Sequence, residues 1–242
     1  MTSSIVVWFK FKILRTLTIR TVFFLFILYL WWRDVSREST FQGFHNIFVQ
    51  NGLKLGIILF IFSEVIFFSG FFWTFFHRRL SPINEIGLRW PPFNIYPLNP
   101  FQIPLLNTCI LLRSGVSVTW RHHSLVNNLK SSKLSLLVTI LLGAYFTFLQ
   151  WFEYNDASCC INDSIFGSTF FVATGFHGFH VLVGSLFLLY SFVRLLINHF
   201  SQYHHLGFEM AIWYWHFVDV VWLFLFSIMY WWRFWFIGEI II

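Results

Sequence analysis

A single carboxylic acid, Glu64, lies near the centre of the apolar run LFIFSEVIFFSGFFWTFF at residues 59–76. Burying a carboxylate charge in a bilayer is costly, so an acid at this depth is a candidate functional group. Two interpretations follow: a proton relay or ion-coupling group, and a structural carboxyl that bonds to another helix. In either case we expect Glu64 to be mostly protonated at neutral pH and to donate a hydrogen bond.

Two histidines, His177 and His180, lie three residues apart in TGFHGFHVLVG and therefore share one face of a helix. Such a pair could supply ligands to zinc or copper. One of them could also be an axial haem ligand, with His216 as the evident partner at matching depth. The other interpretation is polar contact with a neighbouring helix or with lipid headgroups, the usual role of such residues in membranes.

The apolar segment GFEMAIWYWHFVDVVWLF near the C-terminus contains Glu209, His216 and Asp219. With about 100° per helical residue, Glu209 and His216 share a face and Asp219 lies about 60° away. This polar seam fits a proton path or a hydrogen-bonded interface within a helix bundle.

Beside the paired tryptophans of WWRDVSREST, Arg33 and Arg37 lie four residues apart. They could hold a lipid phosphate together or serve as simple interfacial anchors. The sequence contains no phosphate-cradling glycine loop, CxxC pair, HExxH motif or serine nucleophile elbow. These absences argue against catalysis by this chain alone.

The elements that must position these residues are membrane helices. Of the 242 residues, 57% are hydrophobic and 11% are charged, with 35 Phe and 13 Trp, which is more apolar surface than a soluble core needs. The formal net charge of +6 is scattered rather than clustered as nucleic-acid binding requires, and it suits anionic lipid. Three cysteines, at 109, 159 and 160, have no spacing that indicates a disulfide framework.

A spanning helix needs about 20 apolar residues. We therefore predict an all-α transmembrane bundle, a single domain over 1–242, with spans at residues 11–32, 53–76, 104–121, 134–154, 165–197 and 208–232. All six prolines lie between residues 82 and 104, so the spans keep intact backbone bonding. The counts of Lys and Arg on the two sides do not decide the orientation.

The second predicted span has a stripe of small residues along one face: Gly52, Gly56, Ser63, Gly70 and Thr74. Small residues let another helix approach closely in lipid. Glu64 lies about 100° round the helix from this stripe. We therefore expect Glu64 to face a different neighbour from the stripe.

Several long segments resemble subunit III of mitochondrial cytochrome c oxidase. The first two are WWRDVSRESTFQG at 31–43 and SEVIFFSGFFWTFFH at 63–77, and the similarity continues through residues 89–120, 167–189 and 204–232. It therefore covers about residues 30–232 in chain order.

The resemblance implies a subunit of the mitochondrial inner membrane with no haem a or copper of its own, packed against oxidase subunits I and II. That enzyme passes electrons from cytochrome c to oxygen and pumps protons. The resemblance also implies a V-shaped cleft that holds phospholipid or cardiolipin and supports oxygen access, proton uptake and the durability of subunit I. Glu64 matches the family's intramembrane glutamate beside that cleft. The matching lipid-contact positions are Trp32, Glu38, His45, Arg194, His199 and His204.

Two departures from the family pattern carry expectations. Only about 30 residues precede Trp31 and Trp32, whereas family members usually have seven spans, so the first helix of the family is expected to be missing. Another polypeptide or tightly held lipid is then expected in its place. Arg113 stands where the family tends to have a small residue, and a guanidinium in a span needs an acidic partner, which could lie outside this chain.

We also predict that the chain binds no stoichiometric haem, copper or zinc, because its histidines lack a convergent ligand set. The rival hypothesis is a freestanding proton-coupled transporter with Glu64 and the Glu209, His216 and Asp219 seam as its relay. Transporters often show repeated halves and broken helices, and neither is evident in the sequence. An oxidase subunit, unlike a transporter, should co-purify with a haem–copper core.

Overall fold

The computed structural model describes residues 14–82, 84, 87–88, 90–92, 95–96, 98–127 and 133–232. Within these residues the regular structure is entirely helical, as predicted. The elements, in chain order, are α2 (Leu14–Arg37), the π-helical turn η1 (Glu38–Gln42), α3 (Ile47–Leu80), α4 (Ile103–Val126), α5 (Lys133–Asp156), α6 (Ile165–Leu196), α7 (Leu206–Leu225) and the π-helical η4 (Phe226–Trp231). Residues 11–13 of the first predicted span lie outside the described residues.

Five helical stretches among the described residues are long and apolar enough to cross a membrane: Arg15–Gln42, Ile47–Leu80, Lys133–Asp156, Ile165–Leu196 and Leu206–Trp231. They confirm the predicted all-α membrane bundle. The predicted span 104–121 forms helix α4, but α4 is not among the five. The reason is its polar content, since α4 buries Asn107, Thr108 and Ser114. These side chains face other helices rather than lipid, and Thr108 and Ser114 are hydrogen-bonded to indoles of α7.

The chain divides into two compact units, Met1–Lys54 and Leu55–Ile242. In the described part of the first unit, α2 continues directly into η1, which ends at Gly43. Gly43 has a φ of 68°, and its N–H bonds to the carbonyl of Glu38. Glycine adopts positive φ without strain, so the chain turns here before α3 begins. A single domain over 1–242 stays a prediction.

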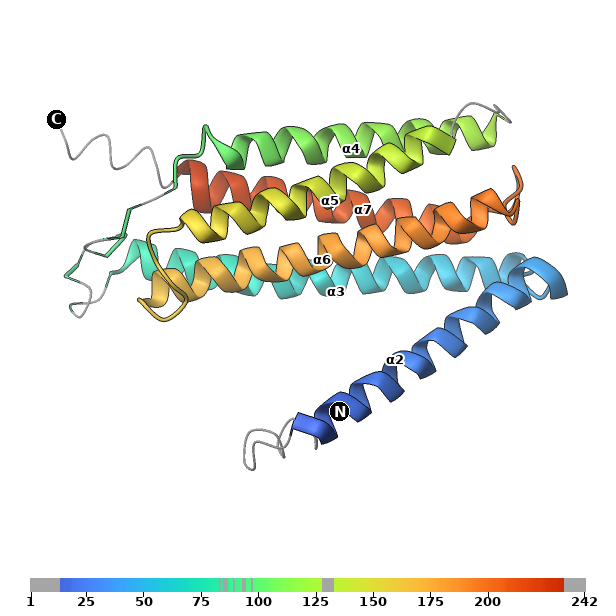
Figure 1. The fold of residues 1–242 in the computed structure, drawn as a ribbon, viewed down its shortest axis with the longest axis horizontal. Helices are drawn as coiled ribbons and strands as arrows, with labels where there is room; N and C mark the ends of the chain where they lie inside the picture. Colours follow the sequence, from blue (N-terminus) through green and yellow to red (C-terminus); the bar gives the residue numbers. More distant parts are fainter. Residues whose placement is uncertain are drawn as a thin grey trace. The chain divides into compact units, whose positions relative to one another are not determined.

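The second unit is built around α7. Helices α4, α5, α6 and α7 lie side by side (Figure 1), with α4 packed on α5 and α7, and α6 packed on α5 and α7. Two fully buried indoles of α7 fix it to α4: Trp215 Nε1 donates to Ser114 Oγ at 2.9 Å, and Trp222 Nε1 donates to Thr108 Oγ1 at 3.0 Å. Buried indoles need such a partner, and α4 supplies it from its polar face.

Glycines let the neighbours of α7 come close to it. A Cβ added at Gly143 of α5 would lie 2.7 Å from the ring of Trp215, and one at Gly184 of α6 would lie 2.9 Å from the same ring. Close packing of this kind is typical of membrane helices, where small residues form the contact.

Helix α3 packs in a different way, through large aromatic side chains. Phe67 contacts Phe176 of α6 with ring centroids 5.1 Å apart, and Phe68 contacts Phe217 of α7 at 6.3 Å. The predicted small-residue stripe is open in the second unit, because a Cβ at Gly56 or Gly70 would meet no described atom within 4 Å. The stripe therefore faces away from the helices that α3 contacts.

Candidate functional site: acid and histidine contacts of the bundle

Glu64 and His180 form an acid–histidine contact between the middles of two helices. Glu64 lies at the middle of α3, and His180 lies at the middle of α6, a 32-residue helix. Helix α6 is started by Ser164, whose side chain accepts hydrogen bonds from the N–H groups of Phe166 and Gly167. The Nε2 of His180 is 3.0 Å from Oε2 of Glu64, so the intramembrane acid has a partner on another helix.

The hydrogen bond of Nδ1 of His180 determines where one proton of this pair lies. Nδ1 of His180 lies 2.6 Å from the carbonyl oxygen of Phe176. A carbonyl only accepts, so Nδ1 carries a proton and donates it. The short contact between Nε2 of His180 and Glu64 then holds one further proton, either on the acid with a neutral imidazole or on the imidazole with a carboxylate. The site can thus store and share a single proton.

Aromatic rings surround the pair. The ring of His180 contacts the rings of Phe68 at 5.3 Å, Tyr214 at 6.3 Å and Phe217 at 6.3 Å. The side chains of His180 and Glu64 are 9% and 20% exposed. A low-dielectric shell of this kind strengthens the hydrogen bond between the two side chains.

His177 bonds in another direction from His180. Its Nε2 lies 3.2 Å from the carbonyl oxygen of Val218 on α7. Its ring contacts Trp222 at 5.1 Å and Phe146 at 5.5 Å. The two histidines therefore bond to α7 and α3 separately, which favours polar contact between helices over a metal shared by the two.

The predicted seam of α7 separates into two places. Glu209 lies beside His205 at the start of the helix, with Oε1 and Nε2 3.4 Å apart. His216 and Asp219 instead face α4: Nε2 of His216 is 3.2 Å from Thr119 Oγ1, and a Cβ at Gly115 would lie 2.7 Å from Asp219 Oδ2. A proton path along the whole seam stays a prediction.

The predicted lipid-contact residues fall in both units. In the first unit, Trp32, Arg37 and Glu38 are exposed around the end of α2, and His45 is half-buried. In the second unit, the guanidinium of Arg194 lies 4.6 Å from the ring of Phe200, and its carbonyl accepts from the N–H of His199 at 2.9 Å. The N–H of His204 donates to Ser201 Oγ. Lipid binding by these residues stays a prediction.

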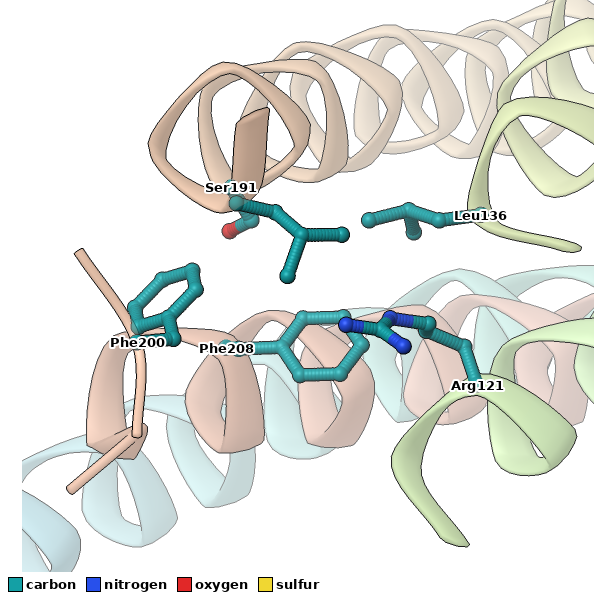
Figure 2. A pocket seen from close by; sticks show the side chains of 6 residues that line it. Arg121, Leu136, Ser191, Phe200 and Phe208 are labelled. Carbon is teal, nitrogen blue, oxygen red and sulfur yellow. The ribbon is translucent and has the colours of Figure 1, made fainter. Parts of the chain in front are cut away.

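A small pocket lies near Arg194, where α4 and α6 end. Its lining residues are Arg121, Leu136, Ser191, Leu195, Phe200 and Phe208. Figure 2 shows the buried guanidinium of Arg121 lying close to the ring of Phe208. Arg121 and Phe208 thus line the pocket together, and Arg194 lies over the ring of Phe200 beside it.

Three titratable side chains meet at this same end, and sequence reasoning missed two of them. His122 in the last turns of α4, His205 at the N-cap of α7 and Glu209 in its first turn each place one possible ligand atom within 4.8 Å of the others. The expectation that the histidines lack a convergent ligand set is therefore wrong for this cluster. The signal in the sequence was a histidine at one helix end and His-x3-Glu at the start of another.

Electrostatics act together on this end cluster of His122, His205 and Glu209. Burial is the largest cause that lowers the pKa of His122, followed by the positive charge of His205. Glu209 raises the pKa of His122, and His123 lowers it. The result is a His122 ring that is held neutral more strongly than an exposed histidine.

A second buried acid was also missed. Glu153 of α5 is 1% exposed and accepts a hydrogen bond from Tyr230 of η4. It lies near the end of a predicted span, where an acid draws less attention than Glu64 does at the centre of one. The contact fastens η4 to α5.

Comparisons with known proteins agree over nearly the whole chain. The family model for cytochrome c oxidase subunit III matches residues 1–234. The cytochrome c oxidase subunit 3 of Mammuthus primigenius is 57% identical over 233 residues, which cover 96% of this chain and 89% of the relative. Subunit 3 proteins of Ceratotherium simum and Loxodonta africana are 58% and 57% identical over the same shares. The match includes the residues before Trp31, where no resemblance was evident from motifs.

Proposed function

Since the chain belongs to the cytochrome c oxidase subunit III family, we propose that it supports the oxidase without carrying out electron transfer itself. The other subunits of the complex are its partners. In this proposal they include the haem–copper subunits I and II, and the assembly lies in the mitochondrial inner membrane. The chain holds phospholipid, stabilises subunit I during turnover and binds neither haem nor copper.

The observation that supports a non-redox role is the bonding of the two α6 histidines. Nε2 of His177 bonds to the carbonyl of Val218, and His180 bonds to Phe176 and Glu64 through its two ring nitrogens. An axial haem ligand needs a free ring nitrogen that faces the iron, and His180 has none. Nδ1 of His177 is unbonded, but it is buried inside the bundle. Ligation by His180 would break a hydrogen bond at mid-membrane depth, where an unsatisfied polar group is costly.

Lipid binding is supported by the basic residues at helix ends. Arg194 lies in the last turn of α6 beside Gly207, where a Cβ would lie 3.1 Å from Nη1 of the arginine. Arg37 ends α2 in the first unit. Guanidinium groups at interface depth pair readily with lipid phosphate. We propose that ordered phospholipid has its phosphate near one or both of these residues.

Contacts with other polypeptides are supported by the open face of α3 and by Arg113. Gly56 and Gly70 leave room for a close neighbour, and Arg113 is exposed in the middle of α4. A cation at this depth needs an acidic or phosphate partner. We propose that neighbouring subunits or tightly held lipid occupy both places.

A photo-crosslinking side chain at Gly70 tests the α3 contact in the whole complex. We expect crosslinks to another polypeptide or to a defined lipid. Leu186 of α6, which is 65% exposed, serves as the matched position and should give diffuse lipid adducts. Diffuse adducts from both positions would refute the contact at Gly70.

Purification separates the proposed function from the transporter hypothesis. The chain should co-purify with a complex that shows a haem spectrum, and the isolated chain should show none. Purification as a stable single chain with affinity for a transported substrate would instead establish the transporter. A haem spectrum in the isolated chain would contradict the non-redox role.

A further inference from the structure

The end cluster goes beyond the supporting role, because its geometry is that of an ion site. The cluster joins two helices through groups that are distant in sequence, His122 on α4 and the His205–Glu209 pair on α7. The ring centroids of His122 and His205 lie 5.4 Å apart. His122 Nε2 and His205 Nε2 are both buried and have no hydrogen-bond partner.

The turn before α7 holds His205 firmly. The N–H of Ser201 donates to the carbonyl of His204 at 3.2 Å, and Nδ1 of His205 lies 3.0 Å from the carbonyl oxygen of Ser201. The carbonyl of His205 accepts from the N–H groups of Phe208 and Glu209. Ligands that are fixed before the ion arrives bind it more tightly, and a histidine with its other nitrogen on a carbonyl is the usual arrangement at metal sites.

The tautomer of His205 places two acceptors against each other. A carbonyl accepts only, so Nδ1 of His205 carries the proton and Nε2 presents a lone pair. That lone pair lies 3.4 Å from Oε1 of Glu209, and a carboxylate oxygen is also an acceptor. Two facing acceptors repel unless a cation, either a proton or a metal ion, lies between them. His122 adds a third possible ligand atom to the same group.

The number and type of ligand atoms select the ion. Two imidazoles and one carboxylate are a known zinc ligand set that leaves one position open. With Zn–N distances of about 2.0–2.1 Å, ligand atoms in a tetrahedron lie about 3.4 Å apart. The His205–Glu209 separation of 3.4 Å already has this value, and all three atoms lie within 4.8 Å.

We propose that His122, His205 and Glu209 bind one Zn²⁺ ion that ties the end of α4 to the start of α7, with a water in the fourth position. The ion removes the repulsion between the facing acceptors and satisfies the two buried imidazole nitrogens. Zn²⁺ has no redox chemistry, so the ion would tie the two helix ends together without taking part in electron transfer.

The test uses the whole oxidase complex, equilibrated with Zn²⁺ and freed of excess metal by gel filtration. Zinc per complex is measured by mass spectrometry in the wild type, His122→Gln and Glu209→Gln. The matched control is His123→Gln, which removes the neighbouring, exposed histidine. We expect each of the first two variants to lose one zinc per complex and the control to lose none. Equal zinc content in all four preparations overturns the proposal.

A measurement on the wild type alone covers variants that fail to assemble. The zinc X-ray absorption spectrum is recorded before and after mild chelation, and the difference isolates the labile ion. We expect a first shell of nitrogen and oxygen at about 2.0–2.1 Å with imidazole scattering. A difference spectrum without imidazole, or no zinc removed and none taken up, overturns the proposal. The proposed supporting function does not require zinc, so failure here leaves that function standing.

Discussion

The interior pair of Glu64 and His180 and the end cluster of His122, His205 and Glu209 share one arrangement. In each, a histidine donates Nδ1–H to a carbonyl four residues earlier, Phe176 for His180 and Ser201 for His205. In each, Nε2 then faces a carboxylate oxygen, at 3.0 Å in the interior and 3.4 Å at the end. The end cluster differs by a second imidazole, that of His122.

This difference shows how the number of groups determines the chemistry of a site. One acid and one imidazole share a proton, which makes a neutral hydrogen bond that the membrane interior tolerates. Two imidazoles and one acid exceed what one proton can satisfy, and a divalent cation suits them better. The interior pair therefore joins two helices without an ion, whereas the end cluster calls for one.

Removal of zinc should have the largest effect on stability, and it should act at the end cluster alone. If zinc is present at 100 times its dissociation constant, its binding stabilises the folded subunit by about 2.7 kcal/mol. Chelation should lower the thermal stability of the wild-type complex accordingly, and Glu64→Gln should respond by the same amount. If chelation no longer lowers the thermal stability of Glu64→Gln, the zinc is bound at the interior pair and not at the end cluster. Thermal unfolding with and without chelator is the measurement.

Removing one partner of the interior pair should lower the stability of the subunit nearly as much. His180→Leu removes the partner of Glu64 and leaves the acid unsatisfied among aromatic rings, which costs about 1–3 kcal/mol. Retention of the subunit in the complex during heating in detergent measures this loss. His123→Leu is the control, because His123 is exposed and its loss should have little effect. Equal stability of the two variants would mean that the 3.0 Å contact contributes nothing.

Removing both partners of the interior pair should cost less than the sum of the single losses. Glu64→Leu with His180→Leu leaves no unsatisfied acid or imidazole, so the double variant should regain most of the stability lost in His180→Leu. The same heating assay on the four proteins of the cycle gives the coupling energy. Strict additivity would show that the two side chains act independently.

Much of the fold was predictable because hydropathy alone reports a membrane helix. The acid at the centre of residues 59–76 was evident for the same reason, since it interrupts an apolar run. Its partner was not, because His180 is 116 residues away and the contact depends on how α3 and α6 are aligned. The end cluster was hidden in the same way, since it joins the ends of two helices whose packing the sequence does not reveal.

Helix α4 shows that hydropathy does not report how a helix packs against its neighbours. Its polar side chains keep it out of the five candidate spans, yet two of them, Ser114 and Thr108, bond to the indoles of Trp215 and Trp222. Conversely, α3 has the highest mean hydropathy of the candidate spans, 2.3, but the smallest share of buried residues of any in the second unit, 6%. Hydropathy identifies what tolerates lipid, and packing within the chain has to be learned from the structure.

The central claim is that this chain supports the oxidase and that Glu64 is a structural partner of His180 rather than an obligatory proton relay. Glu64→Gln tests it most directly, because the amide keeps the shape and can still donate to Nε2 of His180. We predict an initial oxidase rate and a number of protons pumped per electron close to those of the wild type. Glu64→Ala, which removes the group, should chiefly shorten the time for which the enzyme stays active. A collapse of proton pumping in Glu64→Gln, with assembly unchanged, would contradict the claim.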